Sequence, residues 1–345
     1  MVRARARAVL FVAVALCTTI PIVGCASLGS QRPLVGTYAP LRNDALAERS
    51  PELTARFLGT TTVVLSDGLS SIMVDGFFSR PTLRRLLTGP VTPDEARIRG
   101  GLRDAGVTRL SAVLVAHSHH DHAMDAPYVA QLTGATVVGS RSTANIALGS
   151  GFPAKRIEIV GDRWVCRFGE FTVTTFLTPH SKPNLLPGRI AKPLPRSASV
   201  LAYKEGGSYS FHVAHPLGNV LIVPSRAVRP DWSVPLPAAT VFLGMGGRVS
   251  SAEQLRPYWD QFVSGSGAKT VYPIHWDDFF TEYEELERVP RRLARKKALL
   301  ESLSGGTVAI EVPPYTRSIV LGKDNSWVGT TASGQEGRQC RPRDG

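Results

Sequence analysis

The stretch Val115-Ala116-His117-Ser118-His119-His120-Asp121-His122-Ala123 decides the fold of this chain of 345 residues. It holds four of the eight histidines within six positions. Side chains alternate along an extended chain, so His117 and His119 are predicted to point at one spot. As the chain tightens after them, Asp121 and His122 are predicted to point at a second spot.

Neutral imidazoles and a carboxylate are the ligands that zinc prefers, and a catalytic zinc typically keeps one position open for water. Four candidate ligands in six residues therefore predict the start of two neighbouring metal sites. Two metals about 3.5–4 Å apart share a hydroxide and stabilise charge on the attacked and leaving oxygens. The chemistry indicated is hydrolysis. The alternative is a polar loop in which Asp121 or Asp125 caps the next helix.

Strand and helix patterns surround this loop. Residues 112–116 have the length and apolar content of a buried strand, and residues 126–132 have a helical pattern. The remaining expected strands are 62–65, 71–75, 136–139, 156–159, 171–177, 209–214, 220–223, 240–243 and 270–273. The remaining expected helices are 93–105, with Thr92 as N-cap, 252–262 and 291–303. Mixed strands followed by helices in each half suggest two packed sheets covered by helices, although other α/β arrangements stay open.

The segment His117-Ser118-His119-His120-Asp121-His122 fits the HxHxDH signature of the metallo-β-lactamase fold superfamily. The resemblance covers about residues 57–312 and implies an α/β fold, a four-layer αββα sandwich. It implies a first metal held by His117, His119 and His180, and a second held by Asp121, His122 and His275. Taken singly, His180 and His275 also fit hydrogen-bonded histidines at strand ends. His120 takes the variable place and is expected to point away from the metals, either beside the ligands or exposed.

The chain departs from the family pattern at one ligand. Most two-metal members carry a bridging aspartate after a late strand, where this chain reads Ile222-Val223-Pro224-Ser225-Arg226. The hydroxyl of Ser225 is a neutral, weak ligand, so the loss of a carboxylate weakens the second metal. Three interpretations stay open: a pair bridged by hydroxide alone, one metal on three histidines, or a domain that binds without turnover. The expected cofactor is zinc, one or two per chain. Asp231 is an alternative carboxylate, although a surface turn is the preferred interpretation.

Further segments resemble the branch that contains ascorbate-phosphate lactonases and the N-acyl-phosphatidylethanolamine-hydrolysing phospholipase D. They are Gly59-Thr60-Thr61-Thr62, the hairpin ending at Asp75, and Phe242-Leu243-Gly244-Met245-Gly246-Gly247. The resemblance implies attack on a phosphodiester or on a lactone or acyl carbon, with Asp121 as a catalytic residue that orients the hydroxide. A small-molecule or lipid-derived substrate is expected. The rival hypothesis is a tethered binding or scaffold domain that keeps the metal.

The N-terminus predicts export. Residues 1–24 have a basic start and an apolar run over 8–17, which is too short to span a bilayer. After this run come Ile22-Val23-Gly24-Cys25. They resemble the lipobox of bacterial lipoproteins, which implies lipidation of Cys25. An ordinary cleaved signal is the alternative. Residues 25–54 then form a spacer, 55–315 the hydrolase domain, and 316–345 a polar tail.

The charge distribution indicates which partners to expect, and the cysteines indicate one possible disulfide. The net charge is +12, and without the three arginines of residues 1–24 it is 37 minus 28, or +9. The densest basic run, 291–297, lies among Leu and Ala rather than aromatic residues, so nucleic acid is not expected as a partner. Attraction to an anionic membrane, reached through the lipid anchor at the cell envelope, is expected instead. An exported chain permits a disulfide between Cys166 and Cys340 without requiring it.

Overall fold

We analysed a computed structural model of the chain, which describes all residues except 1–51, 279, 281–290, 322–339 and 343–345. The predicted signal segment 1–24, the predicted lipidation site Cys25 and nearly all of the predicted spacer lie outside the described residues. Among the described helices, none combines the length and the apolar character needed to cross a membrane.

The first sheet contains strands from the N-terminal part of the chain. Strands β3 to β6 run parallel up to one edge, and on the other side of β3 the strands β2, β1 and β14 pair antiparallel in turn. The order is β14 (Ser318–Val320), β1 (Thr54–Phe57), β2 (Val63–Ser66), β3 (Ser71–Val74), β4 (Ala112–Leu114), β5 (Thr136–Gly139) and β6 (Ile157–Ile159).

The second sheet comes mainly from the C-terminal part. Strands β10 to β13 run parallel, whereas β8 and β9 pair antiparallel. The order is β13 (Ala309–Ile310), β12 (Thr270–Ile274), β11 (Thr240–Gly244), β10 (Val220–Val223), β9 (Tyr209–Ala214), β8 (Phe171–Leu177), β7 (Trp164–Phe168) and β15 (Cys340–Pro342).

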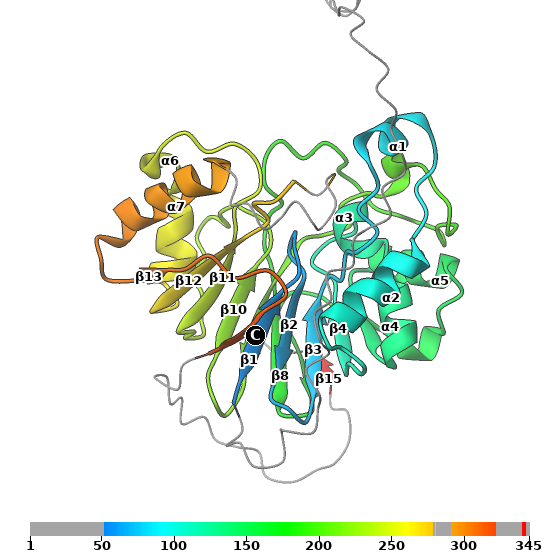
Figure 1. The fold of residues 1–345 in the computed structure, drawn as a ribbon, viewed down its shortest axis with the longest axis horizontal. Coiled ribbons are helices and arrows are strands. Elements are labelled where there is room, and N and C mark those ends of the chain that lie inside the picture. The colour runs from blue at the N-terminus through cyan, green and yellow to red at the C-terminus, as the bar shows by residue number, and fades with distance from the viewer. Residues whose placement is uncertain (1–51, 279, 281–290, 322–339, 343–345) are drawn as a thin grey trace, which may run out of the picture. The chain divides into compact units, whose positions relative to one another are not determined.

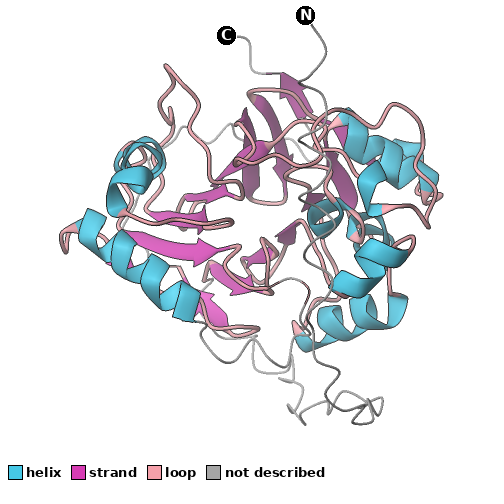
Figure 2. Ribbon diagram, turned by 90° about the horizontal axis from the view of Figure 1, so that it is seen from above, coloured by secondary structure: helices cyan, strands magenta, loops and turns pink. Residues whose placement is uncertain are grey.

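Helices cover the outer face of each sheet, so the domain has four layers (Figures 1 and 2). This confirms the predicted αββα sandwich. On the first sheet lie α2 (Glu95–Asp104), α4 (Ala126–Thr133) and α5 (Arg141–Gly149), while α1 (Leu83–Thr88) and α3 (His120–Ala123) lie at the end of the sandwich (Figure 1). On the second lie α6 (Ala252–Trp259), continued by a π-helical turn over Asp260–Ser264, and α7 (Arg291–Ser304). Single 3₁₀ turns lie at Ala154–Arg156 and Val200–Ala202.

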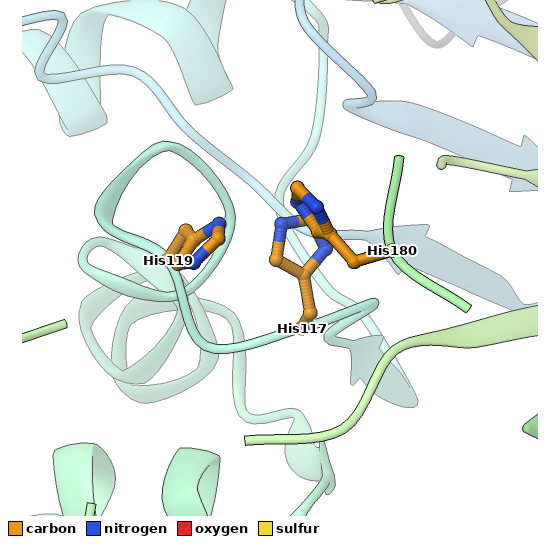
Figure 3. Close-up of side chains that lie close together, drawn as sticks. All are labelled: His117, His119 and His180. Carbon is orange, nitrogen blue, oxygen red and sulfur yellow. The ribbon is translucent and has the colours of Figure 1, made fainter. Parts of the chain in front are cut away.

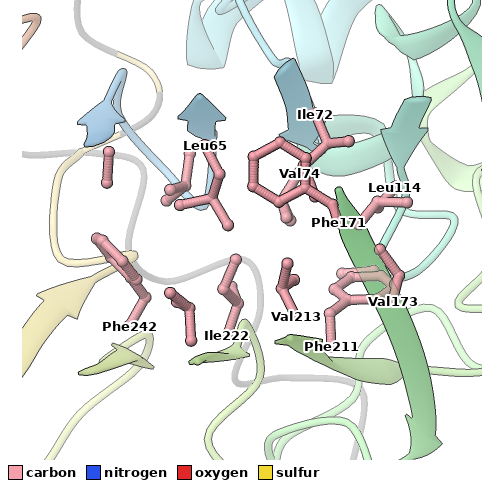
Figure 4. Packing of buried hydrophobic residues seen from close by; sticks show 14 of the residues in the cluster. Leu65, Ile72, Val74, Leu114, Phe171, Val173, Phe211, Val213, Ile222 and Phe242 are labelled. Atoms are coloured by element: carbon pink, nitrogen blue, oxygen red, sulfur yellow. The ribbon is translucent and has the colours of Figure 1, made fainter. Parts of the chain in front are cut away.

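The inner faces of the two sheets meet in an apolar core. Alternate side chains of each strand reach it, including Leu65 and Val74 from the first sheet and Phe211, Val213 and Ile222 from the second (Figure 4). All five are at most 1% exposed. Removing apolar surface from water is the dominant stabilising term here, and it fixes the two sheets face to face.

Several sequence predictions need correction. Helix α2 starts at Glu95 rather than at 93, because the Asp94 side chain, not Thr92, accepts the N–H of Arg97 at 3.1 Å. The short helices α1 and α5 and the strands β1 and β7 were not predicted. Residues 316–345, predicted as a polar tail, contribute β14 and β15 to the two sheets.

The last strand is joined covalently to the sandwich. Cys340 on β15 lies directly opposite Cys166 on β7, and the two form a disulfide. The bond links residues 174 positions apart in sequence. It therefore holds a short edge strand that its few ladder hydrogen bonds alone would hold weakly.

Loss of this disulfide should destabilise the fold. The variant Cys166→Ala/Cys340→Ala is expected to lose about 2–4 kcal/mol of unfolding free energy, because a long loop is no longer closed in the unfolded chain. Urea denaturation followed by circular dichroism measures the loss. The wild-type chain treated with a reductant is the control and should match the variant. An oxidised wild type no more stable than the variant would contradict the prediction.

Candidate metal centre

The predicted ligands lie where strands of both sheets end. His117 follows β4, and α3 carries Asp121 and His122 immediately after it. His180 follows β8 and His275 follows β12 of the other sheet. In each sheet the strands that lead to these residues have their carboxyl ends at one edge. The candidate site thus lies across the top of the sandwich, between the two sheets.

The first group consists of His117, His119 and His180. One nitrogen from each lies within 4.8 Å of the others. Their ring centroids are 4.7–4.8 Å apart and the rings stand nearly edge to face, so they surround one point (Figure 3). The structure therefore brings together the three residues that the sequence assigns to a first metal.

The second group consists of Asp121, His122 and His275, which also present one ligand atom each within 4.8 Å. The His122 ring lies 3.8 Å from that of His117, centroid to centroid, so the two groups are adjacent. His275 takes a left-handed backbone conformation, with φ of 55°. Such a conformation costs energy in a non-glycine residue and is held here by the surrounding contacts.

The donors of both groups suit a divalent metal. Both ring nitrogens of His117 are buried without a hydrogen-bond partner among the described residues. A buried polar atom left in this way is costly unless a ligand satisfies it. Burial lowers the pKa of His119 and of His275 to about 4 and lowers that of His180, so these imidazoles are neutral at pH 7. A neutral imidazole is the form that binds metal.

His122 differs from the other histidines because two carboxylates flank it. Burial lowers its pKa, but the charges of Asp121 and Asp75 outweigh burial and raise the pKa to about 10. The His122 charge in turn holds the pKa of Asp121 well below its usual value, against the effect of burial. Without metal, His122 is therefore an imidazolium between two carboxylates. A metal bound at this ring has to displace a proton.

Asp75, at the end of the first hairpin, orients His122. Its Oδ2 lies 2.8 Å from His122 Nδ1 and also accepts the Thr61 hydroxyl, while Oδ1 accepts the Ala116 N–H at 2.8 Å. With Nδ1–H donated to Asp75, Nε2 is the nitrogen that faces the second group. Asp75 is thus a supporting residue rather than a bridging ligand. Its place beside the end of β4 in a parallel pair is the signal that could have identified this role.

A buried ion pair holds the loop that carries His275. Arg80 Nη2 lies 2.6 Å from Asp277 Oδ2, and both side chains are fully buried. The same carboxylate accepts the Thr60 N–H at 2.8 Å. A Cβ on Gly59 would lie 2.7 Å from Arg80 Nη1, so only glycine fits against this pair. The network joins the β1–β2 loop to the end of β12.

Several further residues lie outside both groups. Ser225 is buried after β10, and no carboxylate stands in its place. His120 is buried with its ring edge against Phe77, 5.9 Å between centroids, so it is not exposed. Asp231 is exposed in a turn, in agreement with the preferred interpretation. His215 pairs with Asp67 in the β2–β3 turn at the opposite end of the sandwich.

The Asp75–His122 contact should support metal binding. We expect Asp75→Asn to weaken metal affinity about 10–100-fold, because the ring loses its anionic acceptor. Competition with a chromophoric chelator measures the affinity, and the weaker-bound metal should be affected more. The matched control is Asp67→Asn, which removes the carboxylate 3.3 Å from His215 Nε2. Equal losses in both variants would mean that the effect is a general one on folding.

Metal binding should also release a proton. Because the metal-free pKa of His122 is raised to about 10, the ring is protonated at pH 8. Its proton must leave when Nε2 binds metal, so about one proton per chain is expected. Calorimetric titration in two buffers of different ionisation enthalpy measures it. Heats independent of the buffer would contradict the assignment of His122 as a ligand.

Comparison with known proteins agrees with this geometry. Residues 55–223 match the family model of the metallo-beta-lactamase superfamily. A curated protein from Heliobacterium modesticaldum, described as a metal-dependent hydrolase, is 32% identical over 111 residues, which are 32% of this chain and 40% of that relative. The match thus spans less than half of the relative's length.

Solved structures give the same fold at low identity. A variant of the β-hydroxylase CmlA of Streptomyces venezuelae is 16% identical with a TM-score of 0.50, covering 79% of this chain and 55% of that one. YhfI of Bacillus subtilis, a metallo-beta-lactamase fold protein, is 14% identical with a TM-score of 0.49, covering 78% and 99%. The likeness to CmlA concerns the fold alone. Residues 55–223 thus match the metallo-beta-lactamase superfamily in sequence, and the described domain has the fold of that superfamily.

Proposed function

We propose that this protein is a metal-dependent hydrolase that acts on a phosphodiester or on a lactone or related acyl substrate. The observation that carries the proposal is the pair of adjacent ligand groups, each with three donors within 4.8 Å. Zinc is the proposed metal, since neutral imidazoles with a single carboxylate match its preference.

The chain's own residues have definable roles in such a reaction. His117, His119 and His180 would hold one metal, and Asp121, His122 and His275 the other. When bound, the metals supply activation of water and stabilisation of negative charge on oxygen. The chain's other contribution is to orient the attacking water and to hold the metal ligands in place.

Asp121 is proposed as the catalytic residue. It is ionised at neutral pH, because its pKa lies well below the usual value, and its Oδ2 lies 3.3 Å from His122 Nε2 and 3.6 Å from His275 Nε2. An ionised carboxylate there accepts a hydrogen bond from the attacking water and orients it. Asp75 keeps His122 in one tautomer, and the Arg80–Asp277 pair keeps His275 in place.

We further propose that the protein is exported and tethered to the cell envelope through a lipid on Cys25. The apolar run 8–17 and the lipobox-like residues before Cys25 support this. The disulfide between Cys166 and Cys340 is compatible with an oxidising compartment.

Metal content and hydrolysis together test the function. Elemental mass spectrometry of the zinc-loaded chain should give about two metals per chain, and aryl phosphodiester and lactone probes should be hydrolysed. His119→Ala should remove one metal, and Asp121→Asn should lower kcat/KM about 100-fold or more. The matched control is His212→Ala, which removes a buried histidine whose Nε2 contacts the carbonyl of Pro237.

The outcomes separate the three interpretations left open at Ser225. Two metals with turnover agree with a pair that needs no bridging carboxylate. One metal with turnover assigns the chemistry to the three-histidine group. Metal bound without hydrolysis of any probe would favour the rival function, a tethered binding domain.

A further inference from the structure

Two segments border the candidate metal centre, and we call them together the rim: residues 81–92 and 181–204. The first begins just after Arg80, which is bound to Asp277 near His275. The second follows His180 directly, and the carbonyl of Leu186 lies 3.1 Å from His119 Nε2. The rim is therefore continuous with the site on both sides.

The rim is one fixed surface rather than two loose loops. Val91 and Ala198 form an antiparallel bridge, with backbone hydrogen bonds of 2.8 and 3.1 Å. Beyond the bridge, the Ile190 N–H donates to Ser142 Oγ at 2.9 Å, and the Leu194 N–H donates to the carbonyl of Asn145 at 2.9 Å. Both acceptors belong to α5. The second segment is thus fixed against α5 and forms a wall beside the site.

Most of the strongly exposed large apolar side chains in the described part of the chain belong to the rim. In the described part of the chain, six large apolar side chains are more than half exposed, and four belong to the rim. These four are Leu83 (52%), Leu87 (78%), Leu185 (81%) and Leu201 (63%); the other two are Leu69 and Val320. Helix α1, which carries two of them, buries none of its residues and lies at the same end of the sandwich as α3 (Figure 1).

The rim also lacks acidic residues. Its 36 positions contain seven bases and no Asp or Glu, although the overall composition, 28 acids in 345 residues, corresponds to about three. One carboxylate contacts the rim from outside it, since Glu205 accepts a hydrogen bond from Asn184. The bases are Arg84, Arg85, Lys182, Arg189, Lys192, Arg196 and Lys204. All but Lys204 are exposed. Exposed leucines among exposed positive charges are the pattern of a surface that lies in a lipid headgroup region.

We propose that the rim docks the mouth of the site on an anionic lipid bilayer. The leucines enter the boundary between headgroups and acyl chains, and the bases contact lipid phosphates. A binding surface for a protein partner would have an apolar centre with polar residues around its border, which is not the pattern here. The inference concerns the orientation of the site toward a bilayer, so its test does not depend on whether the metals turn over substrate.

Hydrogen exchange of the full chain on vesicles tests the proposal. The apolar run 8–17 can hold the chain on any bilayer, so the readout has to be local. On phosphatidylcholine vesicles containing phosphatidylglycerol, amides of 81–92 and 181–204 should exchange roughly fivefold or more slower than on phosphatidylcholine alone. Amides around Leu69, in the turn at the far end of the sandwich, should not change. High salt should abolish the difference, because it screens exposed charge.

Variants identify the side chains responsible. Leu83→Ser/Leu87→Ser and Arg84→Gln/Arg85→Gln should each remove most of the slowing, and both pairs are exposed, so the fold is preserved. Leu69→Ser, at a 93% exposed leucine outside the rim, is the matched control and should change nothing. The proposal is overturned by no slowing on anionic vesicles, by equal slowing on both vesicle types, or by slowing without vesicles that grows with protein concentration, which would indicate a second copy.

Discussion

The candidate site depends on the packing of the two sheets against each other. His117, Asp121 and His122 belong to the first sheet and the helix after it, whereas His180 and His275 follow strands of the second. Neither group of three is complete without both sheets. The apolar core between the sheets therefore does more than stabilise the fold, because any slip of one sheet along the other would separate the ligands.

Two buried carboxylates fix the ligand-bearing loops to the core. Asp75 joins the first hairpin to the backbone of Ala116 and to the His122 ring, so one side chain fixes both the loop and a ligand. Asp277 does the equivalent on the other sheet by binding Thr60 and Arg80. Each carboxylate links segments far apart in sequence, and each has its charge compensated, which is the condition for burying it at tolerable cost.

Local patterns explain which parts of the structure could be predicted. Four of the six proposed ligands, at 117, 119, 121 and 122, carried a strong signal in their spacing, and the strands β9 and β10 carried one in their apolar runs bounded by turn residues. His180 and His275 were indicated only by the family resemblance. The Arg80–Asp277 pair carried none, because it gains its role only through contacts across the fold. Asp75 was indicated only by its place at the end of β3, beside the end of β4. Strands β14 and β15 were missed for a similar reason: they pair with β1 and β7, more than 170 residues away.

The charge balance of the site bears on what it binds. The first group offers three neutral imidazoles, and the second offers one carboxylate, Asp121. Asp75 lies one hydrogen bond further out, Asp277 is neutralised by Arg80, and Ser225 adds no charge. Two dications held this way would keep a net positive charge in a buried place, where an anionic ligand is favoured. A phosphodiester supplies that charge in its ground state, whereas a lactone develops it only during reaction. This positive charge therefore favours the phosphodiester over the lactone as a substrate. It has the same sign as the charge of the rim.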